Sequence, residues 1–219
     1  SLGSCSDDDN DYYLRTVPNA LVTVKVTGDR CYFQLDDQTT LAPGNISKKP
    51  FGDKEVRALV NYTMTDRKDD KYGAVVNVNW IDSILTKKPV PCLANPEEND
   101  AKYGHDAVDI VRDWVTIVED GYLTLRFRAL WGNVKPHSIN LIAHVNPQNP
   151  YEVELRHHTN GDPQLRWGDA LVAFDLNDVL PDTQGKKVKL TVKWKSTVGD
   201  KTVDFDYCSR KSMTAENNN

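Results

Sequence analysis

The closest approach to a metal-binding pattern in this sequence is the pair His157-His158, which is followed by Asp162. Imidazole nitrogens and carboxylate oxygens are common zinc ligands. Adjacent residues on a strand face opposite sides of a sheet, however, so the two histidines are not expected to bind one ion. His144 is expected to face Glu152 across a hairpin, remote from His157. We therefore interpret the pair as polar residues beside a turn and predict neither a metal site nor a cofactor.

Patterns for covalent catalysis are missing from the sequence. It has no serine in a nucleophile elbow, no glycine-rich phosphate loop and no cysteine and histidine constellation with an orienting acid. Aspartate and glutamate are plentiful, so a carboxylate pair for glycoside hydrolysis is an alternative that sequence alone does not exclude. The main prediction is that the chain is not an enzyme and has no catalytic residues.

Five tryptophans could either fill a core or stack on a ligand. Trp114, Trp131 and Trp194 share strand faces with other large apolar side chains, which predicts core positions. Trp80 is predicted to join them. Trp167 lies in a segment flanked by turns and has the weakest apolar pattern around it. Core or interdomain packing is the favoured interpretation of Trp167, and stacking on a sugar is the alternative.

The first residues combine a thiol with acidic side chains. Small and aliphatic residues, Leu2–Ser4, directly precede Cys5, and this order is similar to the end of a bacterial lipoprotein signal, the lipobox. On this interpretation Cys5 is acylated and becomes the first residue of the mature protein. The run Ser6–Asp11 that follows stays hydrated because its like charges repel. Residues 1–15 are therefore predicted to be a lipobox remnant and an acidic tether.

The composition limits the classes of partner. The 219 residues are 39% hydrophobic, and no apolar run approaches the ~18 residues that cross a bilayer, so membrane attachment is expected only through the lipid on Cys5. The net charge of -5 argues against nucleic acid, whose binding depends on Lys and Arg. If Cys5 is lipidated, Cys31, Cys92 and Cys208 allow at most one disulfide. Pairing of Cys92 with Cys208 is one option, and buried free thiols are the default.

Residues 16–86 are predicted to form a small closed barrel. Alternating apolar side chains mark strands at residues 21–27, 31–35, 54–66 and 74–85. Four or five strands without a strong helix favour a sheet that closes on itself to hide its edges, and an OB-like barrel is the best fit. Residues 87–104 contain Pro89, Pro91 and a polar, turn-rich run, so they are predicted to be a linker at the domain boundary.

Residues 105–208 are predicted to form an antiparallel β-sandwich of six to eight strands. Residues 105–118 have both helical and strand periodicity, but Asp120-Gly121 is a strong hairpin signal. Pairing across that turn sets Trp114 opposite Phe127 and Val118 opposite Leu123, which favours a strand from residue 113 onward. Alternation with turns about every ten residues then continues to residue 208. Residues 209–219 have no pattern and are expected to be disordered.

Four lysines at positions 187, 189, 193 and 195 form a basic stripe on one predicted strand. If Gly199-Asp200 is the turn of the last hairpin, Lys195 faces Asp204 and Lys193 faces Asp206. Opposite charges across a sheet give ordinary support of ~0.2–1 kcal/mol per pair. The stripe is therefore predicted to be a solvated charge ladder rather than a site for an anionic partner.

Several segments along the chain together resemble one protein family. They are Leu2–Cys5 with the acidic run, Asp113–Val115, Glu119–Leu123, His157–Asp162, Phe174–Leu176, Leu190–Lys195 and Val198–Lys201. With them the chain resembles a NigD-like protein of the Bacteroides group over nearly its whole length. The resemblance implies an all-β fold, with an N-terminal OB-like domain and a C-terminal β-sandwich. It also implies an outer-membrane lipoprotein, and it brings no catalytic motif.

The resemblance gives two further expectations. The acidic run is similar to the signal that sends Bacteroides lipoproteins to the outer face of the outer membrane, although Asn10 interrupts it. The predicted export residues are Ser6, Asp7, Asp8, Asp9 and Asp11. The sequence Asp82-Ser83-Ile84 matches the short motif that these bacteria O-glycosylate, which makes Ser83 a candidate glycosylation site.

The expected function is therefore that of a non-enzymatic lipoprotein displayed on the outer membrane. It is expected to act as a binding or accessory module whose partner is an envelope protein, a secreted protein or a glycan. A carbohydrate-binding module is the alternative, and a hydrolase with carboxylates in a cleft is a further one. The sequence leaves the oligomeric state open.

Overall fold

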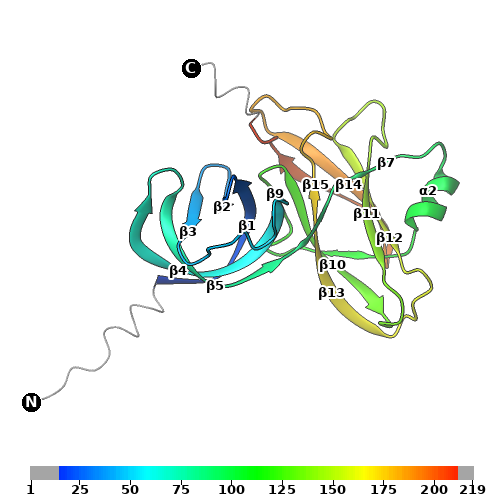
Figure 1. The fold of residues 1–219 in the computed structure, drawn as a ribbon. Coiled ribbons are helices and arrows are strands. Elements are labelled where there is room, and N and C mark those ends of the chain that lie inside the picture. The colour runs from blue at the N-terminus through cyan, green and yellow to red at the C-terminus, as the bar shows by residue number, and fades with distance from the viewer. Residues whose placement is uncertain (1–14, 212–219) are drawn as a thin grey trace, which may run out of the picture. The chain divides into compact units, whose positions relative to one another are not determined.

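The computed structural model describes residues 15–211, and the chain divides into two compact units, residues 1–85 and 86–219. Figure 1 shows that strands dominate both units. The predicted lipidation site Cys5 and the predicted export residues up to Asp11 lie outside the described residues. Within residues 15–211 the structure has no helix long and apolar enough to span a membrane.

The first unit is the closed barrel that the alternating pattern predicts. Its strands are β1 (Thr16–Thr27), β2 (Arg30–Gln34), β3 (Thr40–Pro43), β4 (Val56–Asp69) and β5 (Gly73–Ser83). They follow one another around the barrel in the order β1, β2, β3, β5, β4, and only β3 and β5 run parallel. The inward side chains Val22, Phe33, Ala58, Val60 and Val76 are each completely buried.

Trp80 is not in the barrel core, which corrects the prediction for this residue. Its side chain is 40% exposed. The register between β4 and β5 shifts at this point, because Trp80 pairs with Asn61 while Val78 pairs with the next residue, Tyr62. The extra residue, Asn79, forms a bulge that reverses the alternation. Ile81 therefore packs on the core and Trp80 faces away from it.

The segment predicted to be a linker is folded onto the second unit. It contains β7 (Val90–Pro91), which pairs in parallel with β11, and the helix α2 (Pro96–Tyr103). The polar run that was predicted to form turns begins this helix. Asn95 caps the helix by accepting a hydrogen bond from the Glu98 N–H. Pro96 follows in the first turn, a position that tolerates proline. Tyr103 is 3% exposed and donates to the Pro91 carbonyl at 2.9 Å.

The second unit is a sandwich of two sheets (Figure 1). One sheet has the order β6, β13, β10, β8, with β9 also paired to β10, and the other has the order β15, β14, β12, β11, β7. The remaining bounds are β6 (Leu85–Lys87), β8 (Asp109–Val111), β9 (Ile117–Glu119), β10 (Tyr122–Trp131), β11 (Ser138–Ala143), β12 (Glu152–His158), β13 (Arg166–Asp175), β14 (Val188–Ser196) and β15 (Gly199–Tyr207). The sandwich is not wholly antiparallel, because β7 with β11 and β12 with β14 are parallel pairs.

Inward side chains of both sheets form one core, as the alternation predicts. It includes Leu123, Leu125, Leu141, Val153, Val172, Phe174, Leu190 and Val192, all completely buried. Trp194 is 8% exposed and Trp131 packs against the same cluster, so both of these tryptophans are core residues as predicted.

Trp114, by contrast, is 52% exposed, which corrects its predicted core position. Val118 pairs with Leu123 as expected, but the partner of Phe127 is Ile110 of β8 rather than Trp114. The strand is interrupted because the Asp113 carboxylate accepts a hydrogen bond from the Val115 N–H, two residues on, which makes a turn.

The last hairpin turns at Thr197-Val198, and its predicted register is wrong. Ser196 pairs with Gly199, so Lys195 faces Asp200 and Lys193 faces Thr202. Gly199 lies directly after the turn rather than within it. Its φ of 113° is a backbone conformation that would strain a residue with a side chain. Lys189 faces Asp206, so the strands still pair opposite charges.

The chain remains structured beyond residue 208, where the sequence predicted a disordered tail. The Ser209 N–H donates to the Thr183 hydroxyl at 3.0 Å. The Arg210 guanidinium donates to both carboxylate oxygens of Asp120, each at 3.0 Å, and Asp120 is only 5% exposed. The side chains at 209 and 210 therefore belong to the folded unit.

Candidate functional site

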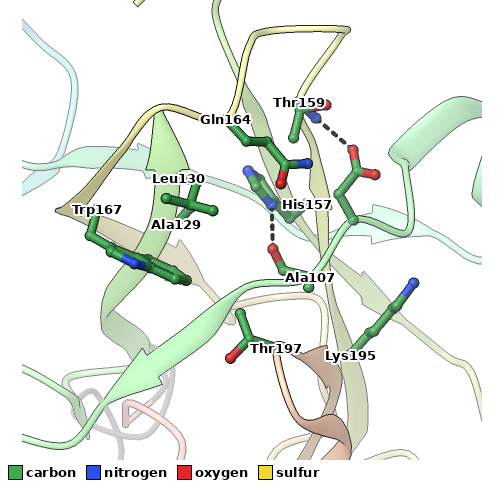
Figure 2. Close-up of a pocket in the computed structure, with 10 residues that line it drawn as sticks. Ala107, Ala129, Leu130, His157, Thr159, Gln164, Trp167, Lys195 and Thr197 are labelled. Carbon is green, nitrogen blue, oxygen red and sulfur yellow. Dashed lines mark hydrogen bonds between the residues drawn. The ribbon is translucent and has the colours of Figure 1, made fainter. Parts of the chain in front are cut away.

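A pocket with a volume of about 250 Å³ opens in the second unit (Figure 2). Both sheets contribute to it: Ala129 and Leu130 lie at the end of β10, Trp167 on β13, His157 on β12 and Lys195 on β14. The connecting segments add Asp106, Ala107, Thr159, Gln164 and Thr197. Chemically different side chains thus meet at one end of the sandwich.

Trp167 is the exposed aromatic of this pocket. Its side chain is 57% exposed, so Trp167 does not lie in the sandwich core, which corrects that part of the favoured prediction, while interdomain packing stays a prediction. The alternation of β13 explains the exposure, because it is the next residue, Gly168, that faces inward. A Cβ atom on Gly168 would lie 3.0 Å from the Trp131 ring, whose Nε1 donates to the Gly168 carbonyl at 2.9 Å. The Trp131 ring fills the space on the inner face of the sheet beside Gly168, and Trp167 lies on the opposite face of that sheet.

Two polar side chains of the pocket are uncommitted. The Gln164 amide and the Lys195 amine make no hydrogen bond or ion pair to another residue between 15 and 211. Both side chains are exposed. The amide offers two donors and one acceptor, and the amine offers three donors. These groups are free to contact a ligand.

Asp106 gives the pocket a carboxylate. Burial would raise the pKa of Asp106, but hydrogen bonds from the backbone and side chain of Thr159 outweigh burial and hold that pKa below its usual value. The Thr159 N–H lies 2.8 Å from Oδ2. Asp106 is therefore ionised at neutral pH and balances the charge of Lys195.

His157 forms the buried wall of the pocket and is 1% exposed. Its Nδ1 lies 3.0 Å from the Ala107 carbonyl, a hydrogen bond drawn in Figure 2, and its Nε2 lies 2.8 Å from Nδ1 of His137. Burial lowers the pKa of His157, which keeps the ring neutral. Because both ring nitrogens have partners, His157 presents no free base to the pocket.

The hydrogen bonds continue from His157 to a buried carboxylate. His137 Nε2 lies 2.7 Å from Asp162 Oδ2, and the two side chains are 3% and 0% exposed. Asp162 also accepts from the backbone N–H groups of Gly132, Val134 and Lys135 at 2.7–3.1 Å. Burial would raise the pKa of Asp162, but these hydrogen bonds outweigh burial and hold that pKa far below its usual range. Asp162 is therefore a carboxylate.

The partners in this chain of hydrogen bonds fix which ring nitrogens of His157 and His137 carry hydrogen. The Ala107 carbonyl and the Asp162 carboxylate only accept, so His157 Nδ1 and His137 Nε2 must both carry hydrogen. The hydrogen bond between the rings needs a third proton. Trp131 stacks on His137 with a centroid distance of 4.2 Å, which helps to hold the ring in place.

His157 and Asp162 are predicted to be polar residues beside a turn. In the structure they are instead joined by hydrogen bonds through His137. That interpretation fits only His158, which is half-buried and accepts a hydrogen bond from the Asn160 N–H at 2.9 Å. His137 carries no sequence signal, because it lies 20 residues from His157 and 25 from Asp162. Between residues 15 and 211, no group of three or more His, Cys, Asp or Glu side chains could hold a metal ion.

The other candidate residues are not among those that line this pocket. Ser83 is exposed at the end of β5, opposite Ala58, and its glycosylation remains a prediction. Cys31, Cys92 and Cys208 are free thiols, so the optional pairing of Cys92 with Cys208 is not formed. Cys31 is buried as expected, whereas Cys92 is exposed.

Comparison with known proteins identifies both units. The NigD-like C-terminal beta sandwich domain matches residues 90–207, and the NigD-like N-terminal OB domain matches residues 21–84. The chain belongs to the NigD-like family. Among curated proteins, none matches this chain.

Solved structures of NigD-like proteins and their neighbours share the fold. A candidate toxin-related protein from Parabacteroides distasonis is 34% identical, with 92% of this chain and 97% of that chain covered and a TM-score of 0.73. A NigD-like immunity protein from Bacteroides caccae is 20% identical, with 88% and 97% covered and a TM-score of 0.62. A candidate lipoprotein from Bacteroides fragilis is 12% identical, with 90% and 100% covered and a TM-score of 0.59. The last two comparisons show likeness of fold alone.

Replacing the buried carboxylate tests the hydrogen-bond chain. Asp162→Asn puts an amide where three backbone N–H groups and the His137 ring need acceptors, so at least one of these donors loses its partner. We expect Tm to fall by roughly 5 °C or more in a thermal melt. Asp178→Asn is the matched control, because Asp178 is exposed at a positive φ that asparagine also tolerates. Equal melting of the two variants would contradict the assigned role of Asp162.

The lowered pKa of His157 predicts a dependence of stability on pH. The His157 ring of the unfolded chain binds a proton near pH 6.5, whereas the ring of the folded chain binds one only at lower pH. The contribution of His157 to the free energy of unfolding is therefore full above pH 6.5 and is lost as the pH falls. We expect the free energy of unfolding, measured with urea, to decrease between pH 6.5 and about 5. In His157→Gln this decrease should be smaller, and an unchanged slope would show that another group causes it.

Proposed function

We propose that this NigD-like protein is a lipid-anchored protein of the outer membrane, exposed on the cell surface, and that it acts as a non-enzymatic binding module. The observation that carries the proposal is the pocket of the sandwich unit, where an exposed Trp167 lies with the uncommitted groups of Gln164 and Lys195. An exposed aromatic with a few convergent polar groups is the usual make-up of a binding site.

The chemistry of the pocket supports binding rather than catalysis. His157 has both nitrogens engaged in hydrogen bonds, so it is poorly placed to accept a proton from a substrate. Asp106 is the only carboxylate that lines the pocket within residues 15–211, whereas glycoside hydrolysis needs a pair. These two observations favour a binding role over the hydrolase alternative.

Attachment to the membrane is supported by the start of the sequence. Cys5 follows a lipobox-like segment and precedes the acidic run Ser6–Asp11. The related fold of a candidate lipoprotein from Bacteroides fragilis agrees with an anchor of this kind. Lipoprotein acylation would supply more than one chain, and stable anchoring needs more than one.

A protein ligand is a second candidate, and one surface feature favours it. Val134 is 70% exposed and Leu165 is 68% exposed. Their loops lie side by side, because Asp162 accepts the Val134 N–H and a Cβ on Gly132 would lie 2.4 Å from the Pro163 carbonyl. Relatives described as toxin-related and as an immunity protein make a secreted polypeptide the natural class of partner to test.

Replacing Cys5 tests the anchor. Cys5→Ala removes the only thiol of the lipobox-like segment, so we expect the protein to leave the membrane fraction and to lose metabolic labelling with a fatty acid. Alanine at Asp7, Asp8, Asp9 and Asp11 should keep the label but protect the protein from protease added to intact cells. Cleavage of this acidic-run variant at the wild-type rate would contradict the export signal.

Crosslinking at the pocket tests the binding role. A photoreactive amino acid at position 165 lies two residues from Trp167, whereas the same group at position 114 replaces an exposed tryptophan outside the pocket lining. On intact cells we expect a specific adduct from position 165 only, and Trp167→Ala should abolish it. An adduct that persists in Trp167→Ala would show that the pocket is not the binding site.

A further inference from the structure

We infer that the pocket of the sandwich unit binds one uncharged sugar ring, stacked on Trp167. This inference deepens the proposed function and rests on it. The ring would be a single unit of a longer glycan, and the rest of that glycan would continue outside the pocket.

The aromatic and apolar lining suits one face of a sugar. Trp167 offers a large apolar surface, more than half of it exposed. The lining also includes the apolar side chains of Ala107, Ala129 and Leu130. The C–H face of a pyranose ring is apolar, so it can pack against the indole while its hydroxyl groups point to the sides.

The size of the pocket limits the ligand to one ring. Its volume of about 250 Å³ lies below the ≈ 300–1,000 Å³ typical of pockets for drug-sized molecules. A peptide or lipid segment would need a longer groove. A single ring whose neighbours remain in solvent fits the available space.

The polar groups of the pocket both donate and accept. Gln164 does both, and the Lys195 amine donates. The Thr197 hydroxyl donates to Asp109 at 2.8 Å, which leaves its oxygen available as an acceptor. Hydroxyl groups of a sugar can meet every one of these groups, because each hydroxyl is both donor and acceptor. A ligand with acceptors only would match the amine but not the threonine oxygen.

The charges of the lining favour a neutral sugar. Lys195 and the ionised Asp106 cancel, and the third titratable residue, His157, is neutral. With no net charge, the lining gives neither an acidic sugar nor an amino sugar an overall attraction that would offset the loss of its hydration. An uncharged ring has no such cost.

The wall of the pocket is held before a ligand arrives. His157 binds the Ala107 carbonyl and is itself held through His137 by the buried Asp162. A preformed wall lowers the entropy cost of binding, which matters for a small ligand with few contacts. The hydrogen-bond chain is therefore a positioning element for the sugar site.

Binding of simple glycosides to the folded protein tests the inference. The probes are the methyl glycosides of glucose, galactose and mannose, with methyl glucuronide and methyl glucosaminide as charged counterparts, measured by ligand-observed NMR titration. We expect at least one neutral glycoside to bind, and Trp167→Ala to weaken it by about tenfold or more, as loss of an aromatic stack does elsewhere. Trp114→Ala is the matched control, because it removes an exposed tryptophan outside the pocket, and it should bind like the wild type.

The possible failures of the inference and of the proposed function are separable. Preference for either charged glycoside, or equal binding by Trp167→Ala and the wild type, would overturn the neutral-sugar inference. Absence of all glycoside binding, with a crosslinked partner from position 165 that still requires Trp167, would overturn the inference and keep the binding role. Absence of glycoside binding together with an adduct that is indifferent to Trp167 would overturn both.

Discussion

The buried carboxylate of Asp162 is the constraint on which the pocket end of the sandwich depends. It accepts hydrogen bonds from three successive parts of the loop after β10, namely Gly132, Val134 and Lys135, and from the ring of His137. A buried charge is tolerated only when it is paired and hydrogen-bonded, and this one is completely covered. The loop has no regular structure of its own, so this single side chain gives it a defined path.

The same interaction reaches the pocket through two rings. His137 is hydrogen-bonded to His157, and His157 is hydrogen-bonded to the Ala107 carbonyl. One pocket wall thus belongs to a continuous hydrogen-bonded chain that crosses from the loop after β10 to β12 and then to the segment before β8. The rest of the lining is less constrained, because Trp167, Gln164 and Lys195 are exposed. A rigid wall combined with adaptable side chains is the arrangement expected of a binding site rather than of a packed core.

Strand periodicity predicted much of the fold and failed at identifiable irregularities. Where inward side chains alternate without interruption, as around Phe33 or Leu125, the predicted core positions are correct. Trp80 was placed on the wrong face because one extra residue in β5 reverses the alternation, and alternation carries no warning of a bulge. The register of the last hairpin was wrong because Gly199 lies after its turn and not inside it.

The sequence by itself determined that the chain is all-β with a barrel and a sandwich, since period-2 alternation is a local property that reads directly from neighbouring residues. It also contained the family resemblance and the Cys5 segment on which the proposed anchor rests. Only the tertiary structure decided that His137, His157 and Asp162 form one buried chain, and that Trp167, Gln164 and Lys195 line one pocket. The physical reason is that such polar contacts join residues 20 or more positions apart. Their partners depend on sheet order and loop paths, which no local pattern encodes.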